Sequence, residues 1–146
     1  MTTTTMLRVA SLFSLLFAVG HSLGGLSHWS PIEANPVLKA MTDFHFRTMG
    51  VERSYLDLYT GLGWSLSVAM FLQTALLWQM ASLARADAAK VRPMIVVFAV
   101  ATLFSGLVAW QLILPVPTVF SAVLLGLLVA AYAMARRPMS HPGRGA

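Results

Sequence analysis

Four long apolar stretches set the outline of this chain. Residues 9–19, 58–81, 94–114 and 116–135 contain no Asp, Glu, Lys, Arg or His. A helix needs about 20 mostly apolar residues to cross the hydrocarbon core of a bilayer. Segment 28–57, in contrast, holds four of the five acids and two of the four histidines. The pattern predicts an all-α integral membrane protein, a four-transmembrane-helix bundle, with any chemistry at one membrane face.

The composition supports this class and removes others. Hydrophobic residues make up 58% of the 146 residues, more than a soluble domain of this size can bury. The formal net charge of +5 indicates topology and not nucleic-acid binding, because the bases fall at the ends of the apolar stretches. The chain has no cysteine, which excludes disulfides, thiolate metal ligands and cysteine nucleophiles.

The apolar stretches divide a single membrane domain into spans and connections. We expect spans near residues 6–27, 52–84, 93–114 and 116–135, an outer cap over 28–51 and a cytoplasmic tail over 136–146. The first span, with Arg8 before a short apolar run, also fits a cleaved signal peptide, so retention or cleavage stays open.

The cap is expected to contain a short amphipathic helix at the membrane interface. Asn35-Pro36 is a suitable helix start, and Gly50 a suitable end. Between them the spacing of four, three and four residues places one face along the helix, made by Val37, Met41, Phe44 and Thr48.

Lysines and arginines predict the orientation. With both termini and the 84–93 turn in the cytoplasm, that side carries seven bases and the outer side three. The positive-inside rule favours this arrangement. The cytoplasmic set is Arg8, Arg85, Lys90, Arg92, Arg136, Arg137 and Arg144; the outer set is Lys39, Arg47 and Arg53.

A histidine pattern, His21-x-x-Gly24-Gly25-x-x-His28, ends the first span. On a helix the two histidines share a face, and His45 in the cap could join them. No metal site is predicted, because the helical H-x-x-x-H pair is missing; His21, His28 and His45 would supply one if it existed. The alternatives are a haem or proton-handling site and a helix end at the headgroups. His21 lies deepest, where ionisable groups are costly and often functional.

A second polar group begins the second span. Arg53 and Asp57 are four residues apart and could pair on a helix, either as a structural ion pair or around a proton-transfer carboxylate. Tyr59 follows them, and Gln111 near the end of the third span could reach the same outer site. The candidate catalytic residues are His21 and Asp57; the candidate ligand-binding residues are His21, His45, Arg53, Asp57, Tyr59 and Gln111, which we expect to converge on one outer pocket.

These motifs carry a resemblance. His21-x-x-Gly24-Gly25, Phe46-x-x-x-Gly50, Arg53-Ser54-Tyr55-x-Asp57-x-Tyr59-x-Gly61-x-Gly63, Ala75-x-x-Trp78-Gln79 and Val91-Arg92-Pro93 resemble a family of small four-helix bacterial integral membrane proteins without an assigned activity. The resemblance implies the fold and a bacterial inner membrane. A looser analogy is to the emopamil-binding-protein-like isomerases, whose characteristic intramembrane Glu is missing from the second to fourth spans.

Three functions follow as alternatives. The first is binding of a lipophilic molecule, such as a lipid, sterol or quinone, at the outer polar site. The second is an acid–base enzyme, such as an isomerase, in which His21 or Asp57 transfers protons and Arg53 or Tyr59 stabilises charge. The third is an accessory subunit of a larger membrane complex, alone or as an oligomer. The residues name no cofactor; the expected partners are the bilayer and a lipophilic ligand.

Overall fold

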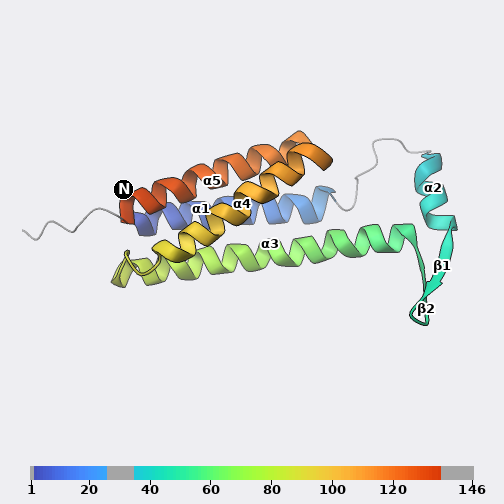
Figure 1. Ribbon diagram of the computed structural model, residues 1–146, viewed down its shortest axis with the longest axis horizontal. Coiled ribbons are helices and arrows are strands. Elements are labelled where there is room, and N and C mark those ends of the chain that lie inside the picture. Colours follow the sequence, from blue (N-terminus) through green and yellow to red (C-terminus); the bar gives the residue numbers. More distant parts are fainter. Residues whose placement is uncertain (1, 26–34, 136–146) are drawn as a thin grey trace, which may run out of the picture. The chain divides into compact units, whose positions relative to one another are not determined.

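The computed structural model describes residues 2–25 and 35–135 (Figure 1). It is all-α, with four helices long and apolar enough to cross a membrane, as predicted. The chain divides into two compact units: Met1–Ser14 with Thr74–Ala146, and Leu15–Gln73. Helices α1 and α3 contribute residues to both.

The four candidate spans follow the apolar stretches closely. Helix α1 covers Thr3–Gly20 and continues as a π-helical turn, His21–Gly25. Helix α3 covers Tyr55–Ala86, α4 covers Arg92–Leu112, and α5 covers Pro115–Ala135. Prolines at the starts of α4 and α5 fit the first helical turn, where no amide hydrogen is needed. At 1.5 Å per residue, the 32 residues of α3 extend about 48 Å, well beyond a hydrocarbon core of about 30 Å.

The core of the first unit brings the start of α1 together with α4, α5 and the second half of α3. Its fully buried side chains include Leu7, Leu77, Ile95 and Leu128. Alanines at the same interface let the helices approach closely. Phe13 and Phe120 stack at 4.8 Å between ring centroids.

Hydroxyl groups add interhelical hydrogen bonds to this core. Ser11 Oγ donates to the Thr74 carbonyl at 2.8 Å, and Thr74 Oγ1 donates to Ser14 Oγ at 3.1 Å. Such bonds between small polar side chains are typical of membrane helix pairs.

The outer faces of the spans stay apolar. In the most apolar 18 residues of each candidate span, at most 33% is buried within the protein. Valines, leucines and phenylalanines cover the remainder, far more than a water-soluble surface carries. Lipid is the solvent that such faces require, so the chain is an integral membrane protein.

The cap contains a shorter helix than predicted. Helix α2 covers Pro36–Asp43, and Asn35 Oδ1 caps it by accepting from the amides of Val37 and Leu38 at 2.9 and 3.3 Å. The predicted start at Asn35-Pro36 is therefore confirmed, whereas the predicted continuation to Met49 is wrong. Phe44 leaves the helix in an extended conformation.

An antiparallel hairpin replaces the rest of the predicted helix. Strand β1, His45–Thr48, pairs with β2, Val51–Ser54 (Figure 1). The two turn residues both have positive φ, 49° at Met49 and 79° at Gly50, which is the pattern of tight hairpin turns. Phe46 of β1 and Phe44 contact the Tyr55 ring, at 5.2 and 5.6 Å between centroids. These ring contacts and the turn favour the hairpin over a longer helix.

Candidate functional site

The residues at the start of α3 form a reciprocal cap. Ser54 donates its amide hydrogen to Asp57 Oδ2 at 2.8 Å, and Asp57 donates its amide hydrogen to Ser54 Oγ at 3.1 Å. This is the geometry of a capping box, with Asp in place of the more common Glu. The Asp57 carboxylate thus stabilises the helix start.

The helical pair predicted between Arg53 and Asp57 is wrong. Arg53 lies on β2, outside the helix, and its Nη1 donates to the Glu52 carbonyl at 2.8 Å. Within the described residues the ion pairs are Lys39–Asp43 and Lys90–Asp87. The i, i+4 spacing required both residues to be helical, and the hairpin removes that condition for Arg53.

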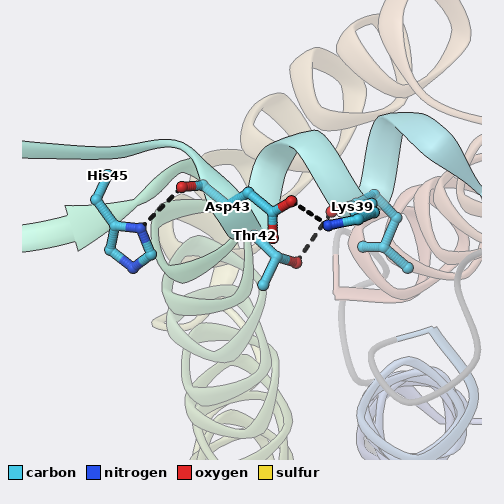
Figure 2. Close-up of polar contacts among 5 residues, drawn as sticks. Lys39, Thr42, Asp43 and His45 are labelled. Atoms are coloured by element: carbon cyan, nitrogen blue, oxygen red, sulfur yellow. Dashed lines mark hydrogen bonds and ion pairs between the residues drawn. The ribbon is translucent and has the colours of Figure 1, made fainter.

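His45 belongs to the local structure of the cap. Its Nδ1 donates to the Asp43 carbonyl at 3.0 Å, while the Asp43 carboxylate pairs with Lys39 (Figure 2). Thr42 Oγ1 donates to the Leu38 carbonyl one turn earlier. These contacts join the end of α2 to the start of β1, and His45 itself is exposed.

His21 lies in a small polar cluster within the apolar spans of the second unit. Its Nδ1 is 3.1 Å from Ser67 Oγ of α3. Ser22 Oγ donates to the Ala18 carbonyl at 2.8 Å and lies 2.9 Å from Ser67 Oγ. Among the described residues, no hydrogen bond engages His21 Nε2. That nitrogen is a donor or an acceptor according to the tautomer.

The cluster coincides with the change from α-helix to π-helix at His21. Single π-helical turns are rare in proteins, but those that occur are often at functional sites, because the wider turn changes the direction of the side chains that follow. An imidazole among lipid-facing helices is itself costly, which makes an ordered histidine here informative.

The predicted site residues of the second unit lie at different levels along the axis of α3. Ser67 lies ten residues beyond Asp57, about 15 Å along the helix axis. His21 therefore lies about 15 Å from the cap along this axis, whereas Arg53 and Asp57 lie next to the cap. Tyr59 lies between these two levels and is partly exposed. A site that uses both levels is elongated, unlike the compact pocket that the sequence predicted.

Two further candidates are not joined to this arrangement. Gln111 is the penultimate residue of α4, in the first unit, so its approach to the outer site stays a prediction. His28 lies outside the described residues. Within residues 2–25 and 35–135, no three His, Asp or Glu side chains gather as metal ligands would.

The sequence interpretation missed the serines. Ser22 and Ser67 give no catalytic pattern, and Ser67 reaches His21 and Ser22 only because α3 packs against the π-helical turn that follows α1. Ser54 did carry a signal, since Ser54-x-x-Asp57 before an apolar run is capping-box spacing.

The comparisons with known proteins add no assignment. No protein-family model, no curated protein and no solved structure matches this chain. The likeness to small four-helix membrane proteins therefore stays a resemblance, and function has to be argued from the site.

Proposed function

We propose that the protein binds a lipophilic small molecule, such as a lipid, sterol or quinone-like compound, along the outer half of α3. The observation that carries the proposal is His21 held by Ser67 within the apolar spans, with Nε2 without a partner among the described residues. A carbonyl or hydroxyl of the ligand would hydrogen-bond to Nε2.

The spacing of polar groups suits an elongated amphiphile. Its polar groups would lie at the His21 level or at the cap about 15 Å away, and its apolar part along the exposed face between. That stretch of α3 offers Leu58, Leu62 and Trp64, each about half exposed or more. Burial of apolar ligand surface there contributes about 25 cal/mol per Å².

We place the protein in a bacterial inner membrane with both termini in the cytoplasm. The charge asymmetry of the connections supports the orientation. The cap and the His21 cluster would then face the outer half of the bilayer.

Extraction of copurified molecules tests the proposal. The protein is purified in mild detergent, extracted with organic solvent, and the extract is quantified by mass spectrometry. We expect one lipophilic compound near equimolar amounts in wild type. His21→Ala should retain about tenfold less, the effect of losing one hydrogen bond of about 1.4 kcal/mol.

Ser65→Ala is the matched control. Ser65 lies two residues before Ser67 on α3, and its hydroxyl donates to the Gly61 carbonyl of its own helix at 2.9 Å. This variant should retain the compound at the wild-type level. Equal retention in His21→Ala, Ser65→Ala and wild type contradicts the proposal.

The two alternative functions give different results. A membrane isomerase would convert the compound and lose turnover in His21→Ala while still binding it; we would expect His21, rather than the α3-capping Asp57, to be its proton carrier. An accessory subunit would copurify with a stoichiometric protein partner and no specific lipophile.

A further inference from the structure

Two arginines of the first unit lie against aromatic rings. The Cζ atom of Arg8, on α1, is 5.1 Å from the ring centroid of Trp78. The Cζ atom of Arg92, at the start of α4, is 5.2 Å from the ring centroid of Tyr132, and its Nη2 is 3.5 Å from the Tyr132 hydroxyl. Each ring holds a guanidinium by cation–π attraction but supplies no strong acceptor to its N–H groups.

Both guanidinium groups retain unused donors. The Nε atoms of Arg8 and Arg92 are buried and have no hydrogen-bond partner within the described residues. Neither side chain takes part in the two ion pairs of that part of the chain. A buried N–H without an acceptor is destabilising, and an arginine inside an apolar span is more so. An anion beside the guanidinium groups would offset the cost of their charge.

The two arginines lie at the same end of the first unit. Leu7 and Val91, their sequence neighbours, belong to one buried cluster. Figure 1 shows the start of α1, the start of α4 and the end of α5 at this end. Arg85 and Lys90 are there too, against the single acid Asp87, which pairs with Lys90 at 3.9 Å. The end is therefore strongly basic.

We propose that Arg8 and Arg92 bind the phosphate of an anionic phospholipid. A planar guanidinium group can donate two parallel hydrogen bonds to two oxygens of one phosphate. Trp78 and Tyr132 are residue types that gather at membrane interfaces. The positive-inside rule assigns this end to the cytoplasmic leaflet, which is rich in anionic lipid. The site is separate from the His21 cluster and does not rest on the proposed function.

Lipid titration followed by native mass spectrometry tests the site. Delipidated protein in nonionic detergent is titrated with dioleoylphosphatidylglycerol or dioleoylphosphatidylcholine. We expect the first phosphatidylglycerol to bind about tenfold more tightly than phosphatidylcholine, and Arg8→Gln/Arg92→Gln to lose that preference. Arg8→Lys/Arg92→Lys keeps the charge but not the planar pair of N–H donors, and its affinity for phosphatidylglycerol should fall about threefold.

Arg85→Gln/Lys90→Gln is the matched control, because it removes the same charge from exposed positions at the same end of the unit. It should change the affinity by less than about twofold, the effect of screened surface charge. A loss equal to that of Arg8→Gln/Arg92→Gln would mean diffuse attraction and overturn the proposal.

Two further results decide the remaining cases. If inorganic phosphate binds as tightly as phosphatidylglycerol, the site takes a soluble anion and the lipid assignment is overturned. If the glutamine variant loses its far-ultraviolet circular dichroism, the lysine variant decides, and unchanged phosphatidylglycerol affinity overturns the proposal. The compound held at His21 should be unaffected by either arginine variant.

Discussion

At the scale of single residues, the start of α3 shows how one carboxylate takes a structural role. Asp57 accepts from the Ser54 amide, and Ser54 accepts from the Asp57 amide, so two otherwise unpaired donors are satisfied. Asp57 therefore has a structural role at this helix start, whereas His21 keeps one ring nitrogen without a hydrogen-bond partner among the described residues.

Removing the cap should lower stability measurably. Ser54→Ala should reduce the free energy of unfolding by about 1 kcal/mol, the usual effect of losing a helix cap. Denaturation in sodium dodecyl sulfate, followed by circular dichroism, measures it. Ser65→Ala, which removes an exposed hydroxyl within the same helix, should change stability by much less. Equal effects of the two variants would show that Ser54 has no capping role.

Single residues were the level at which the sequence was least informative. The position of His21 in an apolar span indicated a special role, but its partner, Ser67, is 46 residues away and carries no motif. The Arg53–Asp57 spacing was compatible with a helix, and the strand conformation of Arg53 could not be read from that spacing.

At the scale of elements, α4 and α5 form the closest described helix contact. A Cβ added at Gly106 of α4 would lie 3.0 Å from Ser121 Cβ of α5, tighter than nine in ten such contacts. One added at Gly126 of α5 would meet nothing within 4 Å. The small side chains at this crossing therefore set the separation of the two helices.

A pair of alanine substitutions tests this contact. Both Gly106→Ala and Gly126→Ala raise helix propensity, so their difference reports the crowding alone. We expect Gly106→Ala to be less stable than Gly126→Ala by about 1–2 kcal/mol in the same unfolding titration. Adding Ser121→Gly to Gly106→Ala should recover the stability that Gly106→Ala loses. Equal stabilities of the two variants would mean that α5 moves away at no cost.

Elements were predicted well where they are long and apolar, and less well in the cap. The helix start at Asn35-Pro36 follows from capping chemistry, and it is correct. The helical spacing through Phe44 and Thr48 was misleading, because a pattern of four residues is too short to distinguish a helix from a strand. The positive φ values at Met49 and Gly50 decide for a hairpin, and a lone glycine did not distinguish that turn from a helix end.

At the scale of the whole molecule, four helices are long and apolar enough to cross a bilayer. The rest of the protein leaves most of their apolar faces uncovered, so lipid has to cover them. Periodic burial was not needed for this prediction: uninterrupted apolar length is enough, because an unpaired backbone is too costly in hydrocarbon. Since α3 joins the β1–β2 hairpin to the 87–90 turn by one continuous helix, these two connections belong on opposite faces.

Cysteine accessibility tests that claim most directly, because the chain has no cysteine of its own. Thr48→Cys in the hairpin, Ala89→Cys in the turn and Val97→Cys on the exposed face of α4 are each treated with a membrane-impermeant maleimide in right-side-out membranes. We predict labelling at residue 48 in intact membranes, at residue 89 only after permeabilisation, and at residue 97 only after denaturation. Labelling of residues 48 and 89 from the same side, or of residue 97 in intact membranes, would show that these helices do not cross the bilayer as described.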